Sequence, residues 1–259
     1  MRRKIMCGRF ALDATAEQVL EFLSVIRIED FPPRFNIAPT QPILMAVGSP
    51  RGEPGSNLPN REALLVRWGF LPGWVKSPDD FPLLINARAE TVNEKASFRA
   101  AMRHRRALVP VSGFYEWRRY PKGSKQKSQA YWIHPKNGGL VAFAGLHETW
   151  ASADGSELDT GAIITCAANT AISKIHDRMP VVIKPEDFPR WLDCMNYEPR
   201  QVADLMVPTD DDFFEAVPIS DLVNKVSNTS PEIQNRVEIA EPDPAPSDKS
   251  AGSGQMSLF

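Results

Sequence analysis

The sequence contains few cysteines, no long apolar run and no secretory signal. Three cysteines in 259 residues make an odd number, and none belongs to a CxxC pair. This usage argues against a disulfide framework or a zinc site and indicates a reducing compartment, so we expect a cytoplasmic protein without a metal or other cofactor. No apolar run approaches the ~20 residues that cross a bilayer, and the basic first residues lead into no apolar segment.

Neither sign of charge is in large excess, since the net charge is −2, but the charges are unevenly distributed. The segment from Lys95 to Ser128 carries ten basic residues and one acidic residue, Glu116, with aromatic residues among them. Such a stretch is typical of a surface that follows nucleic-acid phosphates and stacks on bases. The alternative is a solvated charged face with a basic hairpin.

Strand-like runs outnumber helix-like runs. Thr15 to Gln18 has the pattern of a capping box and predicts a helix over residues 16–27. Strands are predicted at 43–47, 63–70, 107–111, 131–134, 140–146, 162–167 and 213–218. Short helices are predicted at 96–103, 168–175, 185–193 and 199–206. Because the two kinds do not alternate, we expect an α+β domain with a mainly antiparallel, barrel-like sheet and short flanking helices.

The chain divides into three parts by composition. Residues 1–6 form a short basic leader, and residues 7–240 form one domain. Residues 241–259 are rich in Pro, Asp, Ser and Gly, which predicts a disordered tail. Within the domain, residues 49–61 have the composition of an exposed loop.

Five short strings carry most of the candidate chemistry, and four of them place Gly or Pro beside polar groups, a composition typical of functional loops. These strings are Cys7–Phe10, Asn36–Thr40, Asn86–Thr91, Ser112–Trp117 and Ile175–Pro180. Cys7 follows a methionine and can become the first residue of the mature protein. It would then carry a free amine and a free thiol, a pair that captures an aldehyde first as an imine and then as a five-membered ring.

Each of these positions also has a structural interpretation. A lone cysteine such as Cys7 is commonly a small buried hydrophobic residue. His176 can be a hydrogen-bonded structural histidine, and Glu116 can be the solvent-facing position of a strand. Asn86 and Arg88 can form a turn and its salt-bridge partner.

Six strings in this order resemble the SOS-response-associated peptidase (SRAP) family of abasic-site processing proteins. The resemblance extends over residues 7 to 235, and any one string alone would be a weak signal. The strings span residues 6–10, 34–39, 68–74, 85–91, 110–117 and 175–180. The resemblance implies a β-rich SRAP-type fold.

The resemblance also implies a reaction and its residues. The N-terminal cysteine of the family forms a thiazolidine cross-link with the ring-opened sugar of an abasic site in single-stranded DNA. By motif position, Cys7 is the nucleophile, Asn86 places the sugar, Glu116 transfers protons and His176 is the second acid/base group. The implied DNA contacts are Arg9, Asn36, Pro39, Trp74, Arg88, Trp117, Thr165 and Arg178. We expect a monomer that associates with the nucleoid when it is bound to DNA.

The leader before Cys7 decides whether this chemistry is available. An α-amine with a pKa of ~7.7–8.0 and a thiol with a pKa of ~8.5 both react near neutral pH, but only if the amine is free. Translation from Met6 with methionine removal would free it, which we favour, and so would self-cleavage of the leader. Two other functions stay open: an N-terminal-nucleophile thiol peptidase without a DNA role, and a non-catalytic single-strand binding module.

The end of the tail offers one further candidate. Gln255, Leu258 and Phe259 match a short pattern that resembles the bacterial sliding-clamp-binding motif. A disordered peptide of this kind can insert its apolar side chains into a groove of its partner. We therefore expect the replication sliding clamp as a possible partner, besides single-stranded DNA.

Overall fold

The computed structural model describes residues 7–49, 57, 59–120 and 128–239. Several predictions lie outside the described residues: the leader 1–6, the tail 241–259 with its clamp motif Gln255, Leu258 and Phe259, and the lysines Lys122, Lys125 and Lys127. Most of the predicted loop 49–61 also lies outside them.

Five strands close into a barrel. They are β3 (Pro42–Gly48), β4 (Arg61–Trp68), β6 (Arg106–Val111), β9 (Val141–Ala151) and β10 (Glu157–Ala167). Their order is β10-β4-β3-β6-β9, and β9 pairs with β10 again. Neighbouring strands are antiparallel except β4 and β10, which are parallel. The barrel core is tight, because a Cβ on Gly161 would lie 2.4 Å from Cε of Met45.

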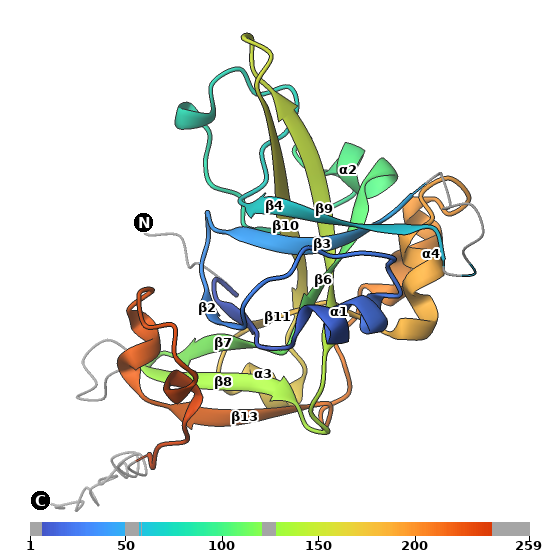
Figure 1. Ribbon diagram of the computed structural model, residues 1–259. Helices are drawn as coiled ribbons and strands as arrows, with labels where there is room; N and C mark the ends of the chain where they lie inside the picture. The colour runs from blue at the N-terminus through green and yellow to red at the C-terminus, as the bar shows by residue number, and fades with distance from the viewer. Residues whose placement is uncertain (1–6, 50–56, 58, 121–127, 240–259) are drawn as a thin grey trace, which may run out of the picture.

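A second, five-stranded sheet lies below the barrel in Figure 1 and is entirely antiparallel. It runs in the order β13 (Phe214–Ile219), β8 (Gln129–Pro135), β7 (Gly113–Arg118), β1 (Phe10–Leu12) and β2 (Arg34–Ile37). Strand β6 of the barrel continues into β7 through Ser112 alone. The next residue, Gly113, must be glycine, since a Cβ there would lie 2.5 Å from the carbonyl oxygen of Ile133.

Three short strands extend the barrel toward the second sheet. They are β5 (Asn86–Arg88), β11 (Arg178–Pro180) and β12 (Val182–Ile183). Strand β5 runs parallel to β10 and β11 runs antiparallel to it, so Thr165 of β10 lies between Arg88 and Pro180. Two of the predicted site strings are thereby placed on either side of one strand.

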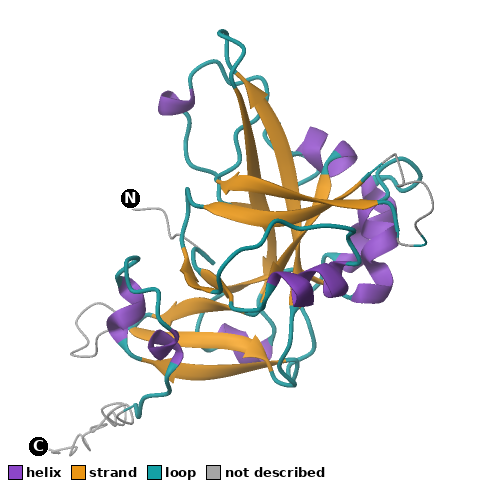
Figure 2. Cartoon of the chain, in the orientation of Figure 1, coloured by secondary structure: helices purple, strands orange, loops and turns teal. Residues whose placement is uncertain are grey.

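The helices are short and lie at the periphery (Figure 2). The α-helices are α1 (Ala16–Leu23), α2 (Arg99–His104), α3 (Thr170–Ser173) and α4 (Phe188–Leu192). The 3₁₀ helices are η1 (Pro78–Asp80), η2 (Pro185–Asp187), η3 (Pro199–Leu205), η4 (Asp221–Asn224) and η5 (Pro231–Gln234).

The start of α1 is as predicted, but its end is not. Thr15 and Gln18 form the capping box with both reciprocal hydrogen bonds. The helix ends at Leu23 and not at residue 27, because Ser24 adopts a left-handed conformation (φ 51°). The N–H of Val25 then donates to the carbonyl of Leu20, which closes a Schellman motif.

The predicted fold class is confirmed: the chain is α+β, with a mainly antiparallel, barrel-like sheet and short flanking helices. The predicted strand positions agree with β3, β4, β6, β8, β9, β10 and β13. β9 and β10 are longer than predicted, and residues 199–205 form a 3₁₀ helix. Among the described residues, no helix has the length and hydropathy needed to cross a bilayer.

Two hydrophobic cores flank strand β7. Phe114 belongs to the main core, which fills the barrel and the space between the sheets, whereas Tyr115 packs in a smaller core beneath η4 and η5. Because side chains alternate along a strand, Glu116 points to the same side as Phe114. This places a carboxylate on the inner face of the second sheet.

Candidate active site

Cys7 and Glu116 meet at the boundary between the barrel and the second sheet. The backbone N–H of Cys7 donates to Oε1 of Glu116 at 2.6 Å, although the residues are 109 positions apart. Cys7 is fully buried and Glu116 is 3% exposed. Cys7 also has a φ of 36°, a value that non-glycine residues rarely adopt. The solvent-facing alternative for Glu116 is therefore wrong.

The protonation of both groups is shifted by burial. Burial raises the pKa of Glu116 to about 7, against the opposing effect of the backbone N–H groups of Cys7 and Trp117. Burial, and secondly the negative charge of Glu116, raise the pKa of the Cys7 thiol well above its usual range. The thiol is thus protonated near neutral pH, while Glu116 can exchange a proton there.

Asn86 reaches the same place from the barrel side. Its strand, β5, pairs with β10, with Asn86 opposite Ile163. Nδ2 of Asn86 donates to the carbonyl oxygen of Cys7 at 3.4 Å. The structure therefore brings three of the four predicted catalytic residues, Cys7, Asn86 and Glu116, into one hydrogen-bonded chain.

His176 lies just before β11 and is 7% exposed. Its Nδ1 accepts the N–H of Arg178 at 3.1 Å and lies 3.1 Å from Oδ1 of Asp177. A neutral ring satisfies the first contact, whereas a protonated ring would donate to the carboxylate. The negative charge of Asp177 makes a minor contribution to the raised pKa of Glu116, which is due mainly to burial.

A second polar cluster surrounds Arg178. Its guanidinium pairs with both carboxylate oxygens of Glu90 and donates to the carbonyl of Thr165. Thr165 itself is fully buried, and its hydroxyl donates to the carbonyl of Ala87 at 3.3 Å. Arg88 is exposed on the neighbouring strand. Of the predicted DNA contacts here, Arg88 and Arg178 are at the surface or near it, and Thr165 holds β5 against β10.

Arg9 and Asn36 form a third cluster. Nη1 of Arg9 donates to Oδ1 of Asn36 at 2.6 Å and to the carbonyl of Val223 at 2.8 Å. Asn36 is 3% exposed. Nε1 of Trp117 donates to Oδ1 of Asn224 at 2.8 Å. All three predicted DNA-contact residues therefore hold the segment that follows β13.

The remaining predicted contacts lie in loops. Pro39 is half-buried in the turn between β2 and β3, before Thr40, whose φ is 73°. Trp74 is 60% exposed and packs edge-on against Phe81, with 5.6 Å between ring centroids. An exposed tryptophan of this kind offers a large flat surface to a partner.

Among the described residues, the basic side chains from Lys95 to Arg119 do not form one surface, which argues against the interpretation of this stretch as one phosphate-following surface. Arg106 is 1% exposed and donates only to backbone carbonyls. Arg103 pairs with Glu198, and Arg105 pairs with Glu148. In Figure 1, α2 and β7 lie in opposite halves of the molecule. The first part of the segment thus stabilises the fold away from Cys7.

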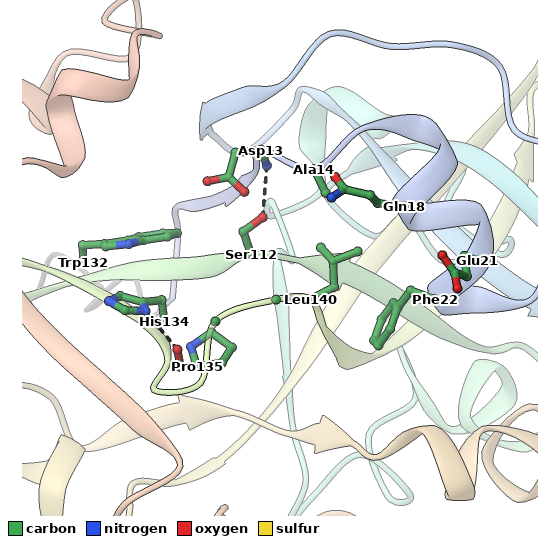
Figure 3. Close-up of a pocket in the computed structure, with 12 residues that line it drawn as sticks. Asp13, Ala14, Gln18, Glu21, Phe22, Ser112, Trp132, His134, Pro135 and Leu140 are labelled. Carbon is green, nitrogen blue, oxygen red and sulfur yellow. Dashed lines mark hydrogen bonds between the residues drawn. The ribbon is translucent and has the colours of Figure 1, made fainter.

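An open cavity of about 680 Å³ lies between α1 and the β8–β9 turn. Figure 3 shows the hydroxyl of Ser112 accepting the Asp13 N–H at its rim, with Trp132 and His134 below. None of the predicted site residues lines this cavity. This cavity is therefore not the candidate site, which is identified by its hydrogen bonds and pKa shifts.

Sequence reasoning missed several residues that complete the site. Glu90 lies within a predicted string, and its charge opposite to that of Arg178 was a usable signal. Asp177 stands next to His176 and could have been considered with it. Asn224 and the residues that follow it carry no sequence signal, because only the fold brings them to Arg9 and Trp117.

Comparisons with known proteins show which proteins this chain is similar to. The family model described as "SOS response associated peptidase (SRAP)" matches residues 6–226. The chain is 38% identical over 231 residues to the abasic site processing protein YoqW of Bacillus subtilis, covering 88% of this chain and 98% of that protein. It is 32% identical over 237 residues to the abasic site processing protein YedK of Escherichia coli, covering 88% and 98%.

A mouse protein and a solved bacterial structure are similar to the chain at lower sequence identity. The chain is 29% identical over 229 residues to the mouse abasic site processing protein HMCES, covering 77% of this chain and 64% of that protein. A solved structure of a protein from Bacteroides thetaiotaomicron is 26% identical, with a TM-score of 0.71, and the match covers 90% of this chain and 100% of that chain. With the match to the family over most of its length, these findings identify the chain as a member of the SOS-response-associated peptidase (SRAP) family.

Proposed function

We propose that this chain binds single-stranded DNA and captures its abasic sites by forming a thiazolidine between Cys7 and the ring-opened sugar. The observation that carries the proposal is the 2.6 Å contact between the nitrogen of Cys7 and the carboxylate of Glu116. It places a proton acceptor with a pKa of about 7 directly on the atom that must attack an aldehyde. The names of YoqW and YedK as abasic site processing proteins support the same substrate.

The reaction requires Cys7 to be the first residue. Its amine nitrogen adds to the aldehyde carbon, and Glu116 accepts the proton that the nitrogen loses. Glu116 returns this proton to the aldehyde oxygen, which becomes a hydroxyl. A second proton passes from the nitrogen to this hydroxyl in the same way, so that it leaves as water and an imine remains. Glu116 is within hydrogen-bond reach of this nitrogen throughout, as general acid/base catalysis demands.

Ring closure joins the thiol to the imine. The sulfur of Cys7 adds to the imine carbon, and the thiol proton passes by way of Glu116 to the imine nitrogen. The net reaction consumes the aminothiol and the aldehyde and releases one water. Because the thiol is held protonated before this step, the amine reacts first. Asn86 orients the carbonyl of Cys7, and His176 would donate to or accept from the hydroxyl groups of the open sugar.

The test is direct. Purified protein that begins at Cys7 is incubated with a single-stranded oligonucleotide carrying an abasic site, followed by denaturing electrophoresis and intact mass measurement. We expect an adduct with the mass of protein plus oligonucleotide minus one water. Cys7→Ala should form none, and the matched control Cys194→Ala should behave as the wild type. An equal adduct yield from Cys7→Ala would refute the proposal.

The same contact favours a second candidate, self-cleavage of the bond between Met6 and Cys7. In that reaction water adds to the carbonyl carbon of Met6 and the bond from this carbon to the nitrogen of Cys7 breaks. Glu116 would pass a proton of the water to the departing nitrogen. The unusual φ of 36° also marks this peptide as conformationally strained. Full-length protein and its Glu116→Gln variant should be compared by N-terminal mass after expression with Met6 replaced by Leu, which removes the alternative start. If both variants keep the leader, self-cleavage is refuted and the leader must be removed by another route or never made.

A further inference from the structure

The turn Val223–Asn228 directs its carbonyl groups inward onto a buried side chain. Nδ2 of Asn36 donates to the carbonyl oxygens of Val223, Lys225 and Asn228 at 3.3, 3.2 and 2.8 Å. Asn36 is 3% exposed, so these contacts form inside the protein. One amide group therefore fixes both ends and the middle of the turn.

Arg9 reinforces the same arrangement. Its guanidinium donates to the carbonyls of Val223 and Asn224 at 2.8 and 3.4 Å and is itself bonded to Asn36. Trp117 binds the side chain of Asn224 from β7. A positive charge is thus held directly behind the turn, and the carbonyl dipoles of the turn face that charge.

The outer side of the turn carries the opposite kind of group. Lys225, Val226 and Ser227 are exposed. The N–H groups of Val226 and Ser227 have no hydrogen-bond partner among the residues that the structure describes. Successive N–H groups on a turn whose carbonyls point away form a concavity that binds anions. A lysine beside them and a guanidinium behind them add positive charge.

The position of the turn indicates which anion would reach it. Arg9 is two residues from Cys7, and Trp117 follows Glu116, so both supports of the turn border the site. Figure 1 shows the segment after β13 beside the ends of β2 and β7. A DNA strand with its abasic sugar at Cys7 would continue past these bordering residues, so a phosphate next to the sugar is the anion expected at the turn.

We propose that the turn Val223–Asn228 is a phosphate-binding element for the DNA backbone, with Arg9 and Asn36 as positioning residues behind it. The proposal rests on the proposed function for its ligand, a phosphodiester next to the captured sugar. It assigns to Lys225, Val226 and Ser227 the contacts that sequence reasoning assigned to Arg9 and Asn36.

The first experiment tests whether Lys225 contacts a phosphate by measuring how DNA affinity depends on salt concentration. Binding of an intact fluorescein-labelled single-stranded oligonucleotide is followed by fluorescence anisotropy over a salt series. Removing one phosphate contact lowers the slope of log affinity against log salt by about 0.7, which we expect for Lys225→Ala. The matched control is Lys136→Ala, an exposed lysine at the end of β8, which should leave the slope unchanged. Equal slopes for both variants would overturn the proposal.

The second experiment tests whether Asn36 acts through the turn. The affinities of Asn36→Ala, Lys225→Ala and the double variant are compared under the same conditions. If Asn36 only positions the turn, the double variant loses no more affinity than Asn36→Ala alone, whereas independent contacts give additive losses. Additive losses would overturn the positioning role. Arg9→Lys, which keeps the charge but loses the planar fork, replaces Asn36→Ala if that variant fails to fold.

These outcomes are separable from the chemistry at Cys7. The oligonucleotide in both experiments has no abasic site, so its binding does not depend on adduct formation. If the wild-type protein binds intact DNA with the expected salt dependence but forms no adduct, the proposed reaction is refuted. The proposal that the turn binds phosphate is then unaffected. Normal adduct formation with an unchanged slope for Lys225→Ala would refute the turn alone.

Discussion

Two buried ionisable side chains lie on consecutive strands, and they differ in how well their charged forms are stabilised. Arg106 begins β6 and is 1% exposed, and Glu116 lies in β7 and is 3% exposed. The donors of Arg106 all reach backbone carbonyls, those of Met102, Trp191, Asp193 and Tyr197. Glu116 accepts N–H groups of the backbone, yet burial still holds its pKa at about 7.

The difference separates a structural charge from a reactive one. The guanidinium of Arg106 ties α4 and the residues after it to the barrel, and it stays charged at every physiological pH. The carboxylate of Glu116 is stabilised so poorly that its two protonation states have similar free energies near neutral pH. A buried group can exchange protons usefully only in the second situation.

Glu116→Gln should have the largest effect on the proposed reaction. The variant keeps the size of the side chain but cannot accept a proton, so the rate of adduct formation should fall by roughly 10²–10⁴. Its free energy of unfolding should be equal to or higher than that of the wild type at pH 8, because a buried negative charge has been removed. Adduct formation at saturating DNA and urea unfolding provide the two measurements. A large loss of stability with a normal rate would make Glu116 structural.

Arg106→Met should show the reverse behaviour. Each buried carbonyl left without its donor costs about 1–3 kcal/mol, so we expect the free energy of unfolding to fall by about 3–5 kcal/mol. The rate of adduct formation should be that of the wild type at a temperature where the variant is folded. Arg103→Met, which removes an ion pair at the surface, is the matched control and should cost at most about 1 kcal/mol. Similar losses from the two arginines would contradict the structural role of Arg106.

The pH dependence of stability sharpens the role of Glu116. Its pKa is raised from 4.5 to about 7 in the folded protein, so the folded state binds more protons than the unfolded state between these values. The wild type should therefore lose about 3 kcal/mol of stability relative to Glu116→Gln as pH rises from 4.5 through 7. Urea unfolding of the two proteins at several pH values gives this stability difference as a function of pH.

The processed chain adds a control to this titration. When Cys7 is the first residue, a charged amine takes the place of the amide that contacts Glu116, and its positive charge should lower the pKa of Glu116. In protein that begins at Cys7, the stability difference between wild type and Glu116→Gln should then change at a pH below 7. In the full-length protein it should change near pH 7. An inflection at the same pH in both forms would show that the contact with Cys7 is absent in solution.

Arg178→Lys should cost much less stability than Arg106→Met, because the Arg178 side chain is 12% exposed and pairs with a carboxylate at the surface. Its guanidinium pairs with the half-exposed carboxylate of Glu90, and a lysine would keep the charge but lose the two-pronged geometry. We expect a loss of about 1 kcal/mol in the free energy of unfolding. Thermal unfolding measures it, and a loss as large as that of Arg106→Met would place Arg178 with the structural charges.

Much of the fold could be predicted because local chemistry determines it. The capping box at Thr15 and the apolar runs of β3, β6 and β10 are readable in the sequence. The end of α1 could not be read, since it depends on Ser24 adopting a left-handed conformation that glycine usually provides. The closure of β10 onto β4 joins residues far apart in sequence and leaves no local signal.

The sequence indicated residues that lie together in the structure, but not the contacts between them. The strings around Cys7, Asn86 and Glu116 led to the residues that the structure brings together. Composition misled us at Arg106, because a count of basic residues does not distinguish a buried guanidinium from an exposed one. The contacts of Arg9 were beyond prediction, since its partners lie on a turn without sequence features.

The hydrogen bond between Arg9 and Val223 has a consequence for how the protein is made. Its two residues are 214 positions apart, so Arg9 is synthesised long before its partner. At typical rates of synthesis this delay is roughly 10–40 s. During that time Arg9, two residues from Cys7, lacks the carbonyl partner that holds its side chain in the finished protein.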